Sequence, residues 1–163
     1  MNLRAQSGIK KPIIKSDVVG GVNSPANLLS WMGKEISVMA WIEDAFGNVL
    51  LVKQKKGRSA WAFPGGKVAS REALLNGLRR ELKEEIGVTV DVATPMDIFD
   101  RSEKANLTIL FRVILVPTSV PKPNPKEIEK LVFRRTLPKV VTPSLRYFWM
   151  RSQKTFDPMS NFI

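Results

Sequence analysis

The sequence predicts one layered domain of the α/β or α+β class. The chain has 163 residues, of which 44% are hydrophobic, and this length supports one core but not two ordinary domains. Strand-like and helix-like segments intermingle along it without an internal repeat. No run of about 18 apolar residues occurs, so we expect no membrane-spanning helix. The N-terminus lacks the apolar core of a secretory signal, which favours a cytoplasmic location.

The first half of the chain is expected to begin with an extension. Residues 1–33 mix Lys, Gly, Ser and Pro with short apolar pairs and show no sustained period, so we place the domain at 34–163. Two apolar segments follow, at 36–42 and 49–53, separated by a short polar stretch. This pattern predicts a β-hairpin. The basic residues after it, up to Arg58, should form a solvated loop.

A turn and a helix are expected next. Pro64 and the two glycines after it cannot continue a helix and allow the backbone to approach another group closely. Ser70 is a suitable N-cap for a helix over 71–86, and Gly87 is a suitable left-handed stop. Residues 88–92 are predicted to form a short strand.

The second half of the chain is expected to hold the most clearly buried strand, at 107–116, which is rich in branched residues and carries one charge. Residues 117–125 contain four prolines and should form an irregular loop. Residues 127–133 fit either a short strand or a turn of helix. Thr142, followed by proline, predicts the start of a last helix. Three apolar side chains should share one face of that helix: Leu145, Phe148 and Trp149.

The charge balance favours partners that carry phosphates. Lys and Arg number 26 against 15 for Asp and Glu, which gives a formal net charge of +11. Such an excess suits nucleotides, nucleic acid or an anionic membrane surface. A basic surface that merely aids solubility is the open alternative.

Two residue types are absent, and their absence excludes several kinds of catalysis. The chain has no cysteine, which rules out disulfides, thiolate nucleophiles and sulfur-ligated metals. It also has no histidine, which rules out a Ser-His-Asp triad, histidine-ligated metals and an imidazole base. Proton transfer in an enzyme of this composition would depend on carboxylates, Lys, Tyr147 or metal-bound water.

Two glutamates lie unusually close to the apolar side of the predicted helix. On a wheel of 100° per residue, Glu85 falls between Leu74 and Leu78, and Glu81 borders the same apolar arc. Like charges four residues apart repel, and a buried unpaired carboxylate costs several kcal/mol. A hard divalent cation with oxygen ligands would compensate both charges.

Other residues of the helix leave two interpretations open. Arg80 and Glu84 are four apart and can form an ordinary exposed ion pair. Gly77 lies one turn before Glu81 and weakens the helix. It either leaves a bare patch for a metal or phosphate, or allows another element to pack closely.

The spacing of these residues resembles the signature of the Nudix hydrolases, with MutT-like members, at every fixed position over residues 66–88. The residues that match are Gly66, Glu72, Arg80-Glu81-Leu82, Glu84-Glu85 and Gly87-Val88. The preceding Trp-x-Phe-Pro-Gly-Gly segment and the order of elements over about 34–152 are also similar. The resemblance implies a single-domain α/β/α sandwich with a mixed sheet. It also implies hydrolysis of a nucleoside diphosphate linked to another group, with Mg²⁺ or Mn²⁺ as cofactor.

The resemblance assigns roles by position. The implied metal ligands are Glu81, Glu84, Glu85 and the carbonyl of Gly66. The implied catalytic residues are the same three glutamates and an acidic residue from a later loop, for which Glu127 is the first candidate and Glu129 and Glu103 are alternatives. Arg80 and Glu72 are expected to orient the loop and the helix. The candidate substrate-binding residues are Arg58, Trp61, Phe63 and Lys67, although an aromatic residue before a tight turn is more often part of the core.

The substrate is predicted by elimination within the family. Glu103, Lys104 and Ala105 occupy the region where related enzymes carry a proline for ADP-ribose or a tyrosine for dinucleoside polyphosphates, and the NADH-type motif is also missing. A nucleoside triphosphate pyrophosphohydrolase that releases NMP and pyrophosphate is therefore favoured. The alternatives are an ADP-ribose or nucleotide-sugar pyrophosphatase, an RNA 5′-pyrophosphohydrolase and a non-catalytic nucleotide sensor.

The expected partner is a nucleotide substrate, and no membrane partner is expected. RNA is compatible with the charge, but no base-stacking motif supports it. The oligomeric state stays open, with a homodimer possible. The 117–126 loop and the N-terminal extension are predicted to be mobile until substrate binds.

Overall fold

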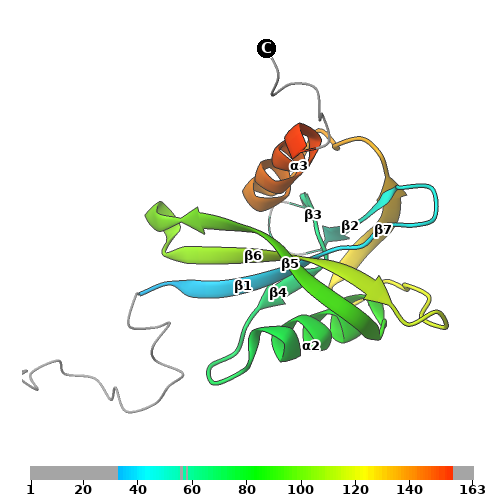
Figure 1. Cartoon of the computed structure of the whole chain (residues 1–163), viewed down its shortest axis with the longest axis horizontal. Helices are drawn as coiled ribbons and strands as arrows, with labels where there is room; N and C mark the ends of the chain where they lie inside the picture. The colour runs from blue at the N-terminus through cyan, green and yellow to red at the C-terminus, as the bar shows by residue number, and fades with distance from the viewer. Residues whose placement is uncertain (1–32, 56, 58, 156–163) are drawn as a thin grey trace, which may run out of the picture.

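The computed structural model describes residues 33–55, 57 and 59–155, and these form two sheets and two α-helices (Figure 1). The predicted extension lies almost entirely outside these residues. The first sheet has the order β4-β1-β6-β5, and the second has the order β3-β2-β7. The elements are β1 (Glu35–Trp41), β2 (Val49–Gln54), β3 (Trp61–Ala62), β4 (Gly65–Lys67), α2 (Leu74–Ile86), β5 (Val90–Arg101), the short 3-10 helix η1 (Ser102–Lys104), β6 (Asn106–Leu115), β7 (Ile128–Arg134) and α3 (Pro143–Thr155).

The first sheet is mixed, as predicted. Strand β1 pairs in parallel with β6 and antiparallel with β4, while β5 pairs antiparallel with β6. Helix α2 lies on one side of the sheets and α3 on the other (Figure 1). The predicted α/β/α sandwich is confirmed. No helix in the described part of the chain is long and apolar enough to cross a membrane.

The two faces of β1 belong to two separate cores, because successive side chains of a strand point to opposite faces. Val38 and Ala40 join the core under α2, together with buried residues of that helix. Trp41 joins the core under α3. The predicted apolar face of α3 is confirmed, since Leu145 is fully buried within this second core.

The predicted hairpin of the first two strands is wrong. Strands β1 and β2 lie in different sheets, and only one isolated bridge, between Glu43 and Val49, joins the segments around their connecting turn. The physical reason is that β1 is a central strand whose two edges are taken by β4 and β6. Its backbone therefore has no free edge for β2, which pairs with β3 and β7 instead.

The helix that carries the glutamates begins three residues later than predicted. Helix α2 starts at Leu74, and Ala73 precedes it without a side-chain cap, so Ser70 is not the N-cap. Arg71 has a φ of 67°, a left-handed backbone conformation that a helix cannot contain. The predicted stop is confirmed, because Gly87 has a φ of 70°.

Three later segments refine the prediction. The strand expected at 88–92 is the start of the longer β5, whose middle part is largely exposed and is held by backbone pairing with β6. The ambiguous segment at 127–133 is a strand, β7. Residues 117–125 are irregular, as predicted, and their mobility before substrate binding stays a prediction. Helix α3 begins at Pro143, with the Thr142 hydroxyl accepting a hydrogen bond from the Leu145 N–H at 3.3 Å.

Candidate active site

Two glycines of β4 bring the sheet into contact with the side chains of α2. Gly65 has a φ of 134°, and a Cβ there would lie 2.2 Å from the carbonyl oxygen of Val38. A Cβ on Gly66 would lie 2.4 Å from the Glu81 carboxylate. Glycine at position 65 therefore lets β4 lie against the backbone of β1, and glycine at position 66 lets Glu81 of α2 lie against the backbone of β4.

Glu85 is the buried carboxylate of this site. Only 4% of the residue is exposed, and its Oε2 accepts a hydrogen bond from the Gly65 N–H at 2.8 Å. Burial is the largest cause of a raised pKa of about 7. The hydrogen bond from Gly65 lowers this pKa, and the negative charges of Glu81 and Glu127 raise it. A hydrogen bond with the Gln54 side chain has a smaller lowering effect. The prediction that Glu85 points toward the core is confirmed.

Arg80 links the loop before α2 to the glutamates on it. Its Nε and Nη2 donate to the two carboxylate oxygens of Glu72, at 2.8 and 2.9 Å. Its Nη2 also donates to the carbonyl oxygen of Lys67 at 3.0 Å, and its Nη1 donates to Glu81 at 2.7 Å and to Glu84 at 3.2 Å. This hydrogen bonding lowers the pKa of Glu72 to about 2. Arg80 and Glu72 therefore join the loop to the helix, in the arrangement that the resemblance implies.

The three glutamates of α2 differ in exposure. The Glu81 side chain is 16% exposed and lies between Arg80 and Gly66. The Glu84 side chain is 52% exposed, pairs with Arg80 and faces outward. Glu85 is buried. The site therefore runs from a protected carboxylate at the sheet to a solvated one at the surface.

Of the three candidate loop acids, Glu127 is the one whose charge raises the pKa of Glu85. It lies in the turn before β7 and is exposed, and its charge contributes to the raised pKa of Glu85. Glu129 instead accepts hydrogen bonds from the Lys53 ammonium and the Ser59 hydroxyl, both at 3.0 Å. Glu103 lies on η1 and pairs with a neighbouring arginine.

The candidate substrate-binding residues do not form one group. Phe63 is fully buried in the core under α3, so its assignment to the substrate is wrong, because no part of its ring can reach a ligand. Trp61 is half-buried at the edge of the same core. Lys67 is exposed and pairs with Glu35 at 2.8 Å. Arg58 lies outside the described residues.

Gly77 serves close packing rather than a bare patch. A Cβ there would lie 3.1 Å from a Glu72 carboxylate oxygen and 3.3 Å from the Val68 side chain. The loop before α2 therefore packs against this position, as the second of the two sequence interpretations expects.

The donor atoms at this site suit a hard divalent cation. The carboxylates of Glu81, Glu84 and Glu85 and the backbone of Gly66 offer only oxygen ligands, which Mg²⁺ prefers. The raised pKa of Glu85 comes first from burial and then from the negative charges of Glu81 and Glu127, which a bound cation would neutralise. In the described part of the chain, no three acidic side chains already converge closely enough to enclose an ion.

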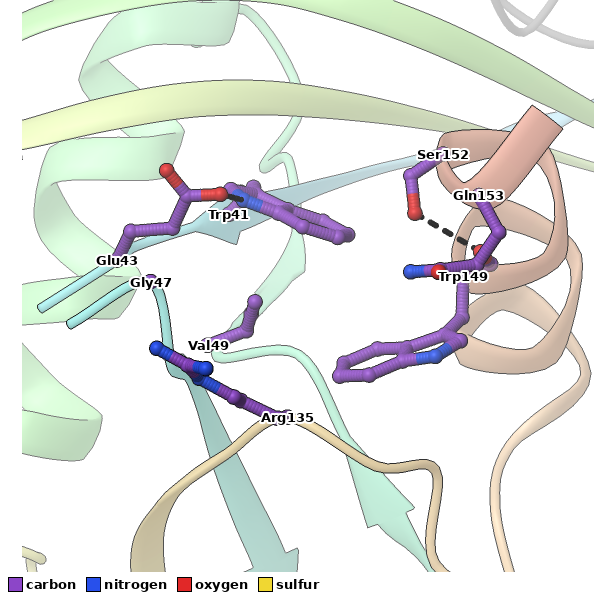
Figure 2. Close-up of a pocket in the computed structure, with 8 residues that line it drawn as sticks. All are labelled: Trp41, Glu43, Gly47, Val49, Arg135, Trp149, Ser152 and Gln153. Carbon is purple, nitrogen blue, oxygen red and sulfur yellow. Dashed lines mark hydrogen bonds between the residues drawn. The ribbon is translucent and has the colours of Figure 1, made fainter. Parts of the chain in front are cut away.

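A hollow lies apart from these glutamates (Figure 2). The residues around it come from the end of β1, the turn after it, the start of β2, the segment after β7 and α3. They are Trp41, Glu43, Gly47, Val49, Arg135, Trp149, Ser152 and Gln153. Its volume is 280 Å³. Two of its polar side chains bind within the protein, since the Trp41 indole donates to Glu43 at 2.7 Å and Arg135 donates to the carbonyl oxygen of Phe46. No predicted site residue lines it.

Sequence reasoning missed two residues next to Glu85. Gln54, at the end of β2, forms a side-chain hydrogen bond with Glu85. Asn124, in the proline-rich loop, donates from its backbone N–H to the Glu85 carbonyl oxygen at 2.8 Å. Neither belongs to a local pattern that would single it out, because each contact joins segments far apart in the chain.

Known proteins resemble this chain in sequence and in fold. An 8-oxo-dGTP diphosphatase from Buchnera aphidicola is 43% identical over 43 residues, which are 26% of this chain and 35% of that protein, so the match spans about a third of the relative. A MutT protein structure from Methanosarcina mazei has 29% identity and a TM-score of 0.60, and the match covers 75% of this chain and 94% of that one. A MutT Nudix hydrolase structure from Burkholderia pseudomallei has 24% identity and a TM-score of 0.64, with 72% and 96% covered, and shows likeness of fold.

The family follows from a match to a protein-family model. The model of the NUDIX domain matches residues 33–149, a range that contains both sheets, α2 and the start of α3. The chain therefore belongs to the Nudix family.

Proposed function

We propose that this Nudix family member is a nucleoside triphosphate pyrophosphohydrolase, which converts its substrate to NMP and pyrophosphate with Mg²⁺ or Mn²⁺. The observation that carries the proposal is the placement of Glu85, which is buried against the Gly65 N–H beside the Glu81 carboxylate. A buried carboxylate without an opposite charge destabilises the folded protein, and a bound cation would supply that opposite charge. A cytoplasmic location, where such substrates are present, is part of the proposal.

The metal would be held by Glu81, Glu84, Glu85 and the Gly66 carbonyl. When bound, the ion supplies a lowered pKa for a coordinated water and neutralises charge on the phosphoryl oxygens. The absence of histidine leaves this chemistry to carboxylates.

The protein's own residues prepare the site. Arg80 fixes the Glu81 carboxylate and, through Glu72 and the Lys67 carbonyl, the loop that precedes α2. Glycine at position 66 lets the Glu81 carboxylate lie directly against the backbone of β4, beside the Gly66 carbonyl that would share the metal. Glu127 and Glu85 are the carboxylates available to accept a proton from the attacking water.

The substrate class rests on two observations. The sequence lacks the ADP-ribose and dinucleoside polyphosphate markers, and the curated relative is an 8-oxo-dGTP diphosphatase. Structures of an ADP-ribose pyrophosphatase and a UDP-X diphosphatase, each 20% identical to this chain, share the fold. Those two substrate classes are therefore included in the test.

The test is a substrate panel assayed for released phosphate and pyrophosphate. It contains nucleoside triphosphates including 8-oxo-dGTP, ADP-ribose, nucleotide sugars and triphosphorylated RNA, each with and without Mg²⁺. We expect metal-dependent release of pyrophosphate from nucleoside triphosphates, and a fall in kcat of at least about 100-fold in Glu85→Gln. Asp91→Asn, an exposed carboxylate-to-amide change on β5, is the control and should match the wild type.

Three outcomes would contradict the proposal. Faster hydrolysis of ADP-ribose, a nucleotide sugar or RNA would refute the substrate class. Full activity in Glu85→Gln would refute the role of that residue. Nucleotide binding without turnover across the whole panel would refute the proposed reaction.

A further inference from the structure

The C-terminal turn of α2 is closed by two different sets of hydrogen bonds. The last carbonyls of a helix have no partner within the helix and must find donors elsewhere. The N–H groups of Gly87 and Val88 reach back to the carbonyls of Lys83 and Leu82, at 3.1 and 3.4 Å. This leaves the carbonyls of the last three residues of α2 without a donor from the helix stop.

The proline-rich loop supplies those missing donors. The Asn124 side-chain amide donates to the carbonyl of Glu84 at 3.0 Å, and the Asn124 backbone N–H donates to the carbonyl of Glu85 at 2.8 Å. The backbone N–H of Lys122 donates to the carbonyl of Ile86 at 2.9 Å. The loop is therefore attached to the same turn that carries two of the site's glutamates.

The acceptor groups of Asn124 organise the turn that follows. Its backbone carbonyl accepts hydrogen bonds from the N–H groups of Glu127 and Ile128, at 3.1 and 2.8 Å. Its side-chain oxygen accepts one from the N–H of Lys126 at 3.1 Å. The Glu127 carbonyl is held in turn by the N–H of Lys55 at 2.9 Å. Asn124 therefore connects the end of α2 directly to the turn that bears Glu127.

We propose that Asn124 is a positioning residue for the reaction, which holds the Glu127 carboxylate beside Glu85. The inference rests on the proposed function and extends it to a residue outside the Nudix signature. Asparagine is suited to this task because its amide donates to the helix while its carbonyl oxygen accepts from the turn. Alanine would lose both side-chain bonds, and aspartate would lose the donor and place a negative charge against the negative end of the helix dipole.

A purely structural cap would have the same contacts, so the test must separate the two roles. If Asn124 acts through Glu127, its replacement should affect catalysis only while the Glu127 carboxylate is present. If Asn124 only stabilises the end of α2, its replacement should have the same effect in either background.

The experiment is a double-mutant cycle on the full chain with the preferred nucleotide and Mg²⁺. The variants are Asn124→Ala, Glu127→Gln, their combination and Ser119→Ala. We expect Asn124→Ala to lower kcat about tenfold or more with little change in KM, and to lower it less than about twofold in the Glu127→Gln background. Ser119→Ala is the matched control, because it removes one side-chain bond from the same loop, the one accepted from the Thr89 N–H at 2.9 Å. Its kcat should match the wild type.

Hydrogen exchange gives a readout that does not depend on activity. In the metal-free protein, Asn124→Ala should increase deuterium uptake at the amide of Lys126, which loses its side-chain acceptor, and at the amides of Glu127 and Ile128 as the turn separates from α2, and Ser119→Ala should not. Unchanged uptake in Asn124→Ala would overturn the proposal.

The kinetic outcomes are also decisive. Equal losses of kcat from Asn124→Ala in both backgrounds, or no effect of Glu127→Gln alone, would overturn the positioning role while leaving the proposed function intact. A wild-type protein that hydrolyses nothing in the panel would instead overturn the proposed function, and the positioning role with it.

Discussion

The burial of Glu85 predicts an unusual stability change in the metal-free protein. In an unfolded chain the pKa of a glutamate is 4.5, and in the folded protein burial raises the pKa of Glu85 to about 7. Between these values the folded state keeps a proton that the unfolded state has lost, so stability falls as pH rises. The difference of about 2.5 pH units corresponds to about 3 kcal/mol at pH 8.5, and to less than about 1 kcal/mol at pH 5.

Glu85→Gln removes this titration while keeping the shape of the side chain. The amide oxygen can still accept from the Gly65 N–H, but the new NH₂ group needs a hydrogen-bond acceptor, which reduces the gain. We expect a net stabilisation of about 1–2 kcal/mol at pH 8.5, which raises Tm by roughly 2–8 °C for a domain of this size. At pH 5 the two proteins should differ little.

The assay is thermal unfolding with EDTA at pH 5 and pH 8.5, and the readout is the Tm difference between variant and wild type. Asp91→Asn, on the exposed strand β5, controls for general charge effects and should show no comparable difference between the two pH values. A Glu85→Gln protein that is less stable than the wild type at both pH values would refute the reasoning, because Glu85 would then be a structural residue.

Two other predictions concern the support of the site. Glu72→Gln should destabilise the protein by about 1–2 kcal/mol at pH 7, measured by urea unfolding, because it removes the ionic pairing with Arg80. The pKa of Glu72 is lowered to about 2, so this difference should be complete above about pH 4.5 and fade as pH falls toward 2; a pH-independent difference would contradict it. Gly66→Ala should keep its Tm but lose activity, since the new methyl group would meet the end of the Glu81 side chain, which can rotate away from its place beside Gly66. Gly65→Ala should unfold at a much lower temperature, because its methyl group would meet backbone atoms; equal Tm values for the two glycine variants would contradict this contrast.

Local sequence patterns predicted the strands and helices better than they predicted which strands pair with each other. The apolar runs at β1, β2 and β6 and the amphipathic pattern of α2 follow from side-chain burial, which a single segment records. The pairing of β1 with β4 and β6 depends on segments far away in the chain. Adjacent strands most often pair with each other, and this preference led to the incorrect hairpin.

The site could be predicted where it depends on helical periodicity. The angular position of Glu85 among leucines is a property of one helix, and its burial followed from that. The contacts of Gln54 and Asn124 arise only when distant segments meet. The Phe63 assignment was wrong because its place in the motif, between β3 and β4, does not reveal that its ring packs into the core under α3.

The most direct test of the central claim is a Mn²⁺ titration followed by electron paramagnetic resonance, which reports free Mn²⁺ without any turnover. The claim is that the α2 carboxylates form a divalent-cation site centred on Glu85. Wild-type protein should bind Mn²⁺ with a Kd at least about tenfold lower than that of Glu85→Gln, while Asp91→Asn binds like the wild type. Equal Mn²⁺ affinity in wild type and Glu85→Gln would contradict the account.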